Sequence, residues 1–296
     1  MSPHQPMTTA LWLQQTAAAL LPLAGLDVAI SDVRLEARRL LGDVLEITPT
    51  ALQLRLHDLL SDAELALLAD ALQRRLQGEP LAYITGRWWF WDLELEVAPC
   101  TLIPRPDTEL LVEQALALSL PTKAKVLDLG TGTGAIALAL AKAKPDWQLY
   151  AVDFNADAVA LAQRNQQRLQ LHNCQIFQSD WFSAVAGQGV DLRFDLIVSN
   201  PPYIDAEDPH LQQGDVKFEP LSALVAPMAG LADLQHICQQ APEFLTNGGW
   251  LWLEHGYQQA EAVQQLLQTA GFSEVSSRRD YAGQWRISGG CFRTQN

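Results

Sequence analysis

The spacing of apolar residues in the first part of the chain is that of α-helices. Apolar residues between Val33 and Val44 recur every three or four positions and form one stripe along a helix. A second helix is expected to begin at Ser61, because Ser61 and Glu64 have the spacing of a capping box, and to end near Gly78. We therefore predict a small all-helical N-terminal domain over residues 1–86.

The segment that follows alternates between apolar and polar residues. Residues 88–91 read Trp-Trp-Phe-Trp, and after them Leu93, Leu95 and Val97 alternate with acidic residues. A period of two indicates a half-buried strand, so we predict a β-hairpin linker over residues 87–106. The pattern leaves open which of the four aromatic residues faces a ligand.

From about residue 107 a helix is expected first, with Asp107 or Thr108 as its cap, and then short β-rich runs that alternate with helical patterns. Such alternation predicts an α/β domain over residues 107–296, with a mostly parallel sheet covered by helices on both faces. The last two strands have no room for a helix between them and should pair antiparallel at one edge. The expected strands are 126–129, 149–152, 175–177, 194–198, 250–253, 273–281 and 285–292, seven in all, and the expected helices are 135–143, 156–170, 229–246 and 258–270.

Composition and charge narrow the classes of function. The chain has 296 residues, of which 48% are hydrophobic and 18% charged, as is typical of globular proteins. Its 20 Lys and Arg against 34 Asp and Glu give a formal net charge of −14, and the resulting negative field weighs against a nucleic-acid partner. Scattered cysteines and histidines predict reduced thiols and no metal site. Without a basic leader or a long apolar run, we expect a cytoplasmic protein.

A glycine-rich loop directly follows the first strand of the expected sheet. The loop reads Gly130-Thr131-Gly132-Thr133-Gly134 and leads into a helix, so its backbone is able to turn tightly and approach a ligand. Asp153 follows at the end of the next strand, where a carboxylate binds ribose hydroxyls. These residues predict a nucleotide-like cofactor, and they fit NAD and S-adenosylmethionine equally well.

A second motif, Asn200-Pro201-Pro202-Tyr203, ends a later strand of the same sheet. Neither proline has an N–H group, so this turn presents the Asn200 side-chain oxygen and bare backbone carbonyls beside a tyrosine ring. Two acceptors and an aromatic face suit a planar NH2 group. At the carboxyl end of a strand, downstream of a cofactor loop, the motif favours a site that holds such an amino group with its nitrogen lone pair toward an electrophile, over a purely structural turn.

Together these motifs resemble the S-adenosylmethionine-dependent methyltransferases that act on planar amino groups. Further segments resemble one branch closely, the N5-glutamine methyltransferases of peptide chain release factors, also called the HemK/PrmC family. The resemblance covers nearly the whole chain and implies a Rossmann-like methyltransferase domain behind the helical domain. The stretch 288–291 matches the family pattern more loosely. The segments that carry the resemblance are 102–109, 179–182, 218–220 and 253–256.

The resemblance also implies a role for each motif. Residues 130–134 would hold the methionine end of S-adenosylmethionine, Asp153 its ribose, and Trp181, with Asp180 beside it, its adenine. S-adenosylhomocysteine would be the product. The catalytic and substrate-binding residues would be Asn200, Pro201, Pro202 and Tyr203, of which Asn200 would also contact the cofactor.

The implied reaction methylates the N5 nitrogen of the glutamine in the Gly-Gly-Gln motif of class-1 release factors, and so modulates translation termination. We expect a monomer whose helical domain recognises the release factor, without direct nucleic-acid or membrane contact. Arg105 and Glu109 either orient the loop, contact substrate or form an interdomain ion pair, whereas His210 and His255 are expected to be structural. The alternative is a DNA adenine-N6 methyltransferase, which needs a Lys/Arg cluster that this sequence lacks. A non-enzymatic scaffold has no use for residues 200–203, and an NAD dehydrogenase would need a hydride-site acid or base.

Overall fold

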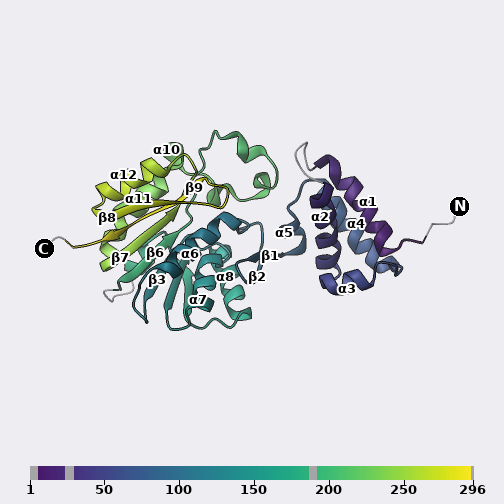
Figure 1. Ribbon diagram of the computed structural model, residues 1–296, viewed down its shortest axis with the longest axis horizontal. Coiled ribbons are helices and arrows are strands. Elements are labelled where there is room, and N and C mark those ends of the chain that lie inside the picture. The colour runs from purple at the N-terminus through teal and green to yellow at the C-terminus, as the bar shows by residue number, and fades with distance from the viewer. Residues whose placement is uncertain (1–5, 24–29, 187–191, 295–296) are drawn as a thin grey trace. The chain divides into compact units, whose positions relative to one another are not determined.

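A computed structural model of the chain describes residues 6–23, 30–186 and 192–294. These residues fall into two compact units, Met1–Gly86 and Arg87–Asn296. Figure 1 shows that the first unit is made of helices and that the second is built around a sheet. Within the described ranges, no helix has both the length and the apolarity that crossing a membrane requires.

The first unit buries most of the apolar stripe predicted between Val33 and Val44, but only part of the stripe on the next helix, whose Leu76 is exposed. Leu40, Leu41 and Leu68 are fully buried between its helices. The capping box is present, because the Ser61 hydroxyl accepts a bond from the backbone N–H of Glu64 while the Glu64 carboxylate accepts one from Ser61 at 2.8 Å. The elements of this unit are α1 (Thr9–Leu20), η1 (Leu21–Leu23), α2 (Ile30–Val44), α3 (Pro49–Leu54), α4 (Asp62–Leu76) and α5 (Leu81–Thr85).

A short hairpin opens the second unit. Its strands are β1 (Arg87–Phe90) and β2 (Leu93–Glu96), and they pair antiparallel. Asn165, on helix α8 (Ala156–Arg168), accepts a bond from the backbone N–H of Glu96 at 2.7 Å and donates one to its carbonyl at 3.0 Å. Leu95 is fully buried in the same core as the sheet. The hairpin is therefore packed into the second unit.

A seven-stranded sheet runs through the second unit in the order β5-β4-β3-β6-β7-β9-β8. The first five strands in this order are parallel, and β9 pairs antiparallel with both β7 and β8. The predicted fold, a mostly parallel sheet with an antiparallel edge and a helical region before it, is confirmed. The strands are β3 (Lys125–Leu129), β4 (Gln148–Asp153), β5 (Cys174–Gln178), β6 (Phe194–Ser199), β7 (Leu245–Glu254), β8 (Phe272–Arg279) and β9 (Trp285–Phe292).

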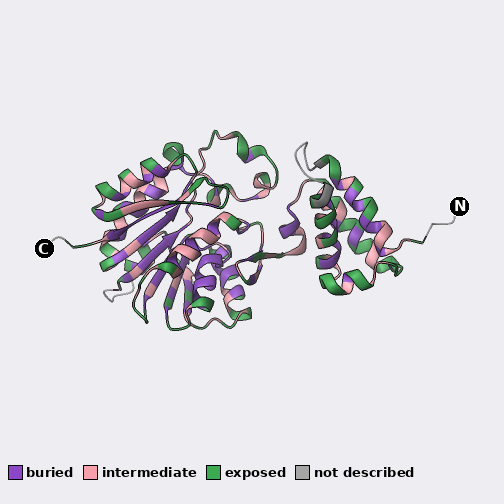
Figure 2. Ribbon diagram, viewed as in Figure 1, coloured by how far each residue is buried: buried purple, intermediate pink, exposed green. Residues whose placement is uncertain are grey.

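Helices cover both faces of the sheet. Because successive strand residues point to opposite sides, neighbouring residues of one strand enter different cores. Val126 of β3 belongs to a core shared with α6, α7 and α8, whereas Leu127 belongs to a core shared with α11 and α12. Figure 2 shows the strands buried and the helices exposed along their outer sides. Besides α8, the covering helices are α6 (Glu109–Ala117), α7 (Ala135–Ala143), α11 (Ala232–Phe244) and α12 (Ala260–Thr269).

The helix expected over residues 229–246 begins later than its sequence predicts. Met228 and Ala229 have left-handed φ angles of 58° and 55°, and helix α11 begins only at Ala232. The cause is close packing at Gly230, where an added Cβ would lie 2.0 Å from the carbonyl oxygen of Tyr203. The backbone bends here so that it can lie directly against the Asn200–Tyr203 turn.

The carboxyl ends of three adjacent parallel strands meet at the centre of the sheet. Strand β3 lies between β4 and β6, so the chain order reverses there. In open α/β sheets a ligand site is expected at such a switch point. Both motifs of the sequence lie at this edge, since the glycine loop follows β3, Asp153 ends β4 and Asn200 follows β6.

Candidate active site

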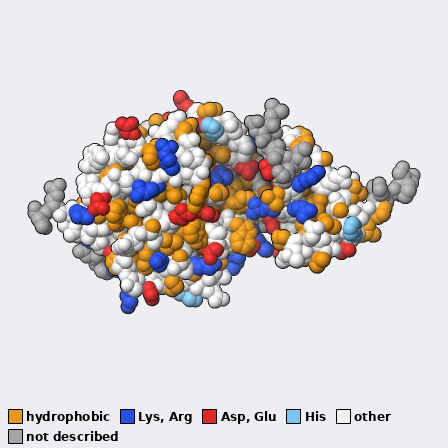
Figure 3. All heavy atoms as spheres, viewed as in Figure 1, with side chains coloured by type: hydrophobic (Ala, Val, Ile, Leu, Met, Phe, Trp, Pro, Cys, Tyr) orange, Lys and Arg blue, Asp and Glu red, His pale blue; other side chains and the backbone are white. Residues whose placement is uncertain are grey.

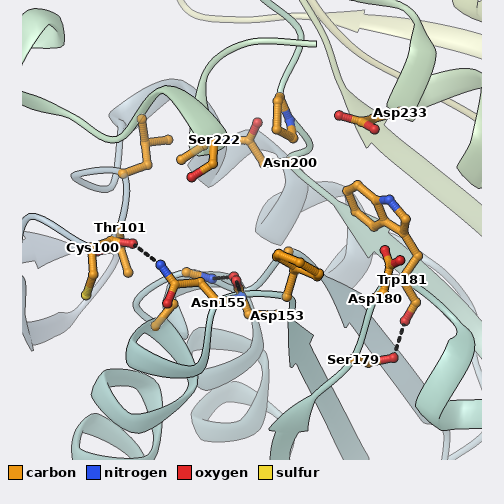
Figure 4. A pocket seen from close by; sticks show the side chains of 17 residues that line it. Cys100, Thr101, Asp153, Asn155, Ser179, Asp180, Trp181, Asn200, Ser222 and Asp233 are labelled. Atoms are coloured by element: carbon orange, nitrogen blue, oxygen red, sulfur yellow. Dashed lines mark hydrogen bonds between the residues drawn. The ribbon is translucent and has the colours of Figure 1, made fainter. Parts of the chain in front are cut away.

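A cavity of about 320 Å³ opens at the switch point, between the ends of β3, β4 and β6. The predicted site residues that line it are Gly130, Gly132, Asp153, Trp181, Asn200 and Pro202. Figure 4 shows Asp153 and Asn155 on one side of this cavity, Trp181 on another, and Asn200 with Ser222 above them. Its volume is that of a site for a small molecule or cofactor.

The glycine loop forms one wall with its backbone. Gly130 and Gly132 have φ angles of 69° and 56°, a conformation that favours glycine. The backbone N–H of Gly132 donates to Asp153 Oδ2 at 2.9 Å, which ties the loop to the end of β4. The cavity wall here is open backbone, which lets a ligand approach closely.

The other three loop residues lie behind this wall. The Thr131 hydroxyl donates to the fully buried Asp128 at 2.6 Å, and burial raises the pKa of that carboxyl to about 7. The Thr133 carbonyl accepts a bond from Asn165 at 3.0 Å. At Gly134, φ is 86° and an added Cβ would lie 2.9 Å from a methyl group of Leu138. Thr131, Thr133 and Gly134 therefore support the loop from inside the protein.

Asp153 presents its carboxylate to the cavity. Its Oδ2 accepts the Gly132 amide, and its Oδ1 accepts the backbone N–H of Asn155 at 2.9 Å. Burial raises the pKa of the Asp153 carboxyl, although its backbone hydrogen bonds oppose that shift. Each carboxylate oxygen keeps a second lone pair, so the group is able to accept two further hydrogen bonds from a ligand.

Trp181 forms an aromatic wall across from the loop. Its φ angle of 46° lies in the left-handed region, which is unusual for a bulky residue. The Ser179 hydroxyl donates to the Trp181 carbonyl at 2.7 Å, and an added Cβ on Gly130 would lie 3.7 Å from the indole ring. Asp180 and Asp233 also line the cavity beside the ring.

The Asn200–Tyr203 turn lies where this cavity meets a smaller one of about 110 Å³. Asn200 lines both cavities, Pro202 lines the larger, and Pro201 and Tyr203 line the smaller. The Tyr203 hydroxyl donates to Glu254 Oε1 at 3.1 Å. Burial and the nearby charge of Glu254 raise the pKa of the Tyr203 hydroxyl. The structure thus divides the four predicted residues between two adjoining spaces.

Two segments that the sequence did not assign to the site complete the cavity. Thr101 and Leu102 line it from before the sheet, and Ser222 and Ala223 line it from the loop after the turn. Glu219 joins the two segments through its hydrogen bonds with Ile103 and Arg105. In the sequence, Leu102 belongs to segment 102–109, Thr101 directly precedes it, and Ser222 and Ala223 follow shortly after segment 218–220; both segments resemble the family pattern.

Arg105 and Glu109 have separate partners. Arg105 pairs with the buried Glu219 at 2.6 Å, and the other Glu219 oxygen accepts the backbone N–H of Ile103 at 3.1 Å. Glu109 accepts the backbone N–H of Trp91 at 2.8 Å. All of these partners belong to the second unit, so these contacts orient its loops.

The two histidines have structural surroundings. His255 is fully buried, with Nδ1 at 2.8 Å from the Gly256 carbonyl and Nε2 at 2.7 Å from the Ser288 hydroxyl. His210 is exposed and pairs with Asp208 at 2.7 Å. His255 and His210 are not among the residues that line the two cavities.

Comparisons with known proteins agree with this geometry. The methyltransferase small domain family matches residues 106–215, and the PrmC N-terminal domain matches residues 12–86. A methyltransferase from Pyrococcus furiosus shares the fold, with a TM-score of 0.52 and 20% identity over 77% of this chain and 100% of that one. So does the 16S rRNA N2 G1207 methyltransferase RsmC of T. thermophilus, solved with AdoMet and guanosine, with a TM-score of 0.50 and 21% identity over 70% of this chain and 50% of that one.

Curated relatives are much more similar in sequence. The release factor glutamine methyltransferase of Salmonella typhimurium is 59% identical over 79% of this chain and 83% of its own length. The enzyme of the same name from Escherichia coli is 57% identical over the same shares. That of Pseudomonas aeruginosa is 58% identical over 74% of this chain and 78% of its own. The chain therefore belongs to the release factor glutamine methyltransferase (PrmC/HemK) family.

Proposed function

We propose that this protein transfers the methyl group of S-adenosylmethionine to the side-chain amide nitrogen of a glutamine in a peptide chain release factor. One observation carries the proposal beyond family membership. Asn200, an amide acceptor, stands where a cofactor-sized cavity meets a smaller one, so a methyl donor in the first and a glutamine side chain in the second would meet beside it.

The larger cavity suits S-adenosylmethionine in three respects. The open backbone at Gly130 and Gly132 allows close approach of the methionine end, and the Asp153 carboxylate has lone pairs for the two ribose hydroxyls. The Trp181 ring offers a flat face for adenine. When bound, the cofactor supplies an electrophilic methyl group on a sulfonium centre.

The turn would hold and activate the glutamine. An amide nitrogen is a poor nucleophile because its lone pair is delocalised into the carbonyl. If the Asn200 side-chain oxygen and the Pro201 carbonyl each accept one of its N–H bonds, they stabilise the positive charge that develops on nitrogen during the transfer. The proton can leave after the C–N bond forms, so the turn needs no general base before it.

Both the net charge of the chain and its family favour a protein over DNA as the substrate. A DNA adenine methyltransferase must grip phosphates, but this chain carries a formal net charge of −14. Figure 3 shows acidic and basic side chains interspersed over the face in view. We propose that the enzyme acts as a monomer in the cytoplasm. Recognition of the release factor is assigned to the helical unit, residues 1–86.

The test is methyl transfer from labelled S-adenosylmethionine to a release factor, with the same factor carrying asparagine in place of the acceptor glutamine as the control. Duplex DNA is the competing substrate. We expect label only in the factor with glutamine, and label in DNA would overturn the proposal. Asn200→Ala should lower turnover by about 10²- to 10³-fold, as the loss of an electrostatic stabiliser does. Its affinity for S-adenosylhomocysteine should change much less, and unchanged turnover would exclude the amide clamp.

A further inference from the structure

The smaller cavity beside the Asn200–Tyr203 turn contains a cation that the amide clamp does not use. Among the described residues that line this cavity, Arg105 alone has a charged side chain. The clamp accepts the two N–H groups of the substrate amide and leaves the amide oxygen without a donor. A carbonyl oxygen that is buried without a hydrogen bond is costly, so a donor is expected in the same cavity.

The backbone holds Arg105 in an extended conformation. Arg105 stands between Pro104 and Pro106, and its φ and ψ angles of −101° and 145° are those of a residue before proline. Its carbonyl accepts the backbone N–H of Thr108 at 3.1 Å, at the end of a 3-10 turn (Pro106–Thr108). The arginine is therefore presented from a segment with little conformational freedom.

Glu219 holds the guanidinium without lining either cavity. Its Oε2 accepts from Arg105 Nη2 at 2.6 Å, and its Oε1 accepts the backbone N–H of Ile103 at 3.1 Å. The Glu219 side chain has no exposed surface, whereas 34% of the Arg105 side chain is exposed. One nitrogen of the guanidinium is thus fixed inside the protein, while the group stays accessible from the cavity.

This one contact leaves most of the guanidinium donors unused. A guanidinium carries five N–H donors in one plane. In the described part of the chain, the Arg105 guanidinium donates to Glu219 alone, through Nη2. The donors on Nε and Nη1 remain for a ligand.

The other polar side chains that line the smaller cavity are already hydrogen-bonded inside the protein. The Tyr203 hydroxyl donates its one hydrogen to Glu254 Oε1 at 3.1 Å. Asn200 Nδ2 donates to the Thr108 hydroxyl at 3.1 Å, and the Asn200 oxygen is assigned to the substrate NH2. Arg105 is therefore the side chain of this cavity that has several donors to offer.

We propose that Arg105 donates a hydrogen bond to the side-chain carbonyl oxygen of the substrate glutamine, and that Glu219 is the positioning residue that holds its guanidinium. This inference rests on the proposed function, in which a glutamine side chain occupies the smaller cavity. The substrate amide is then held at both ends, by acceptors of the turn at its nitrogen and by Arg105 at its oxygen. Such a pocket selects an amide over an apolar side chain of the same length.

The contact acts on binding more than on the rate of transfer. In the bound amide, the nitrogen lone pair is partly delocalised onto the oxygen, and this delocalisation is lost as the nitrogen bonds to the methyl carbon. The oxygen becomes less negative during the transfer, so a donor to it is no stronger in the transition state than before. Loss of Arg105 should accordingly raise KM for the release factor and change kcat less.

A double-mutant cycle between enzyme and substrate tests the contact. The probe is a release factor with either glutamine or methionine at the acceptor position, because methionine has a similar length but no carbonyl oxygen or NH2 group in its side chain. Kd of both factors is measured by calorimetry with S-adenosylhomocysteine present. We expect Arg105→Met to weaken binding of the glutamine factor about 10- to 100-fold, and of the methionine factor less than about threefold.

Equal losses for the two factors would overturn the proposal. They are what a purely structural role of Arg105 predicts, since a displaced loop affects both factors, and also what a bond to the main chain of the factor predicts. If Arg105→Met does not fold, Arg105→Lys takes its place, because an ammonium group can pair with Glu219 but lacks the planar fork of donors. A lysine variant with the full preference of the wild type for glutamine would likewise overturn the proposal.

Arg164→Met is the matched control. Arg164 also pairs with a glutamate, Glu96, at 3.2 Å, but it is exposed and lines neither cavity. Kd of this variant for both factors should equal that of the wild type.

Glu219→Gln tests the positioning residue. Glutamine keeps an oxygen for the Ile103 N–H, but its NH2 group would face the donors of Arg105 and displace the guanidinium. We expect the glutamine factor to bind about tenfold more weakly and the methionine factor to bind as before. Equal losses for the two factors would remove Glu219 from the proposal.

Methyl transfer from labelled S-adenosylmethionine, followed separately, distinguishes this inference from the proposed function. If Arg105→Met removes a preference for the glutamine factor but the wild type transfers no label, the contact stands and the proposed function fails. If label is transferred but the preference does not depend on Arg105, the proposed function stands and the inference is wrong. If neither factor binds the wild type, both are overturned.

Discussion

Removing the carboxylate of Asp153 should weaken cofactor binding by an amount that can be worked out from its contacts. Its two oxygens each accept one backbone N–H at 2.9 Å, from Gly132 and Asn155, and each keeps a lone pair for one ribose hydroxyl. A hydrogen bond to a charged group contributes about 1.5–3 kcal/mol. Asp153→Ala should therefore lose at least about 3 kcal/mol, or roughly 100-fold in Kd, since about 1.4 kcal/mol corresponds to tenfold.

The assay is calorimetric titration with S-adenosylhomocysteine. Asp153→Asn keeps one acceptor oxygen, so its loss should be intermediate, roughly tenfold. Asp157→Ala is the matched control, because this substitution also removes one carboxylate charge. Asp157 is exposed in the first turn of α8 and does not line the cavity. Its Kd should equal that of the wild type.

The pH dependence gives a second check on Asp153. Burial raises the pKa of this carboxyl above its ordinary 3.8, and protonation removes an acceptor. Affinity of the wild type should accordingly fall as pH drops through this raised pKa, at a higher pH than an ordinary aspartate would give, while Asp153→Ala should lack this step. A folded Asp153→Ala whose Kd stays within threefold of the wild type would refute the ribose assignment.

Two further predictions concern stability and are measured by chemical denaturation. Gly289→Ala should destabilise the protein by about 3 kcal/mol or more, because the added Cβ would lie 2.3 Å from the Trp252 ring. Gly283→Ala, in open space at a φ of 81°, should lose only about 1 kcal/mol, and equal losses would contradict the packing argument. Glu64→Ala should lose about 1 kcal/mol at neutral pH by breaking the capping box, and Asp62→Ala, outside the box, should lose less. Hydrogen bonds from Ser61 and Arg55 lower the pKa of Glu64 from its ordinary 4.5 to about 2, so its contribution is present above pH 4.5 and disappears as pH falls toward 2. A difference from wild type that is unchanged at pH 2 would contradict this account.

Periodicity and caps made most of the fold predictable. The helix expected at 135–143 is α7 and the strand expected at 285–292 is β9, each with the same bounds. Both segments have a strong pattern and a clear break at each end. Strand β7 begins at Leu245, five residues before the predicted start at residue 250. The prediction started the strand too late because Asn247-Gly248-Gly249 has the composition of a turn.

The order of the strands and the second wall of the cavity were not predictable from local patterns. Thr101 and Leu102 reach the cavity because Glu219, 116 residues after Ile103, binds the segment that contains them. Likewise, Thr108 has the sequence position of a helix cap, and only its contact with Asn200 shows another use. Such features depend on contacts between distant segments, which no window of sequence contains.

The backbone of Trp181 places stability and binding in opposition at one position. A left-handed φ in a bulky residue stores about 1–3 kcal/mol of strain, which glycine at the same place would not. Selection for a more stable fold alone would therefore remove the indole. Its presence means that the flat wall of the cavity is already formed before any ligand arrives, so that binding loses little conformational entropy there, and that this preorganisation is maintained at the expense of the folded state.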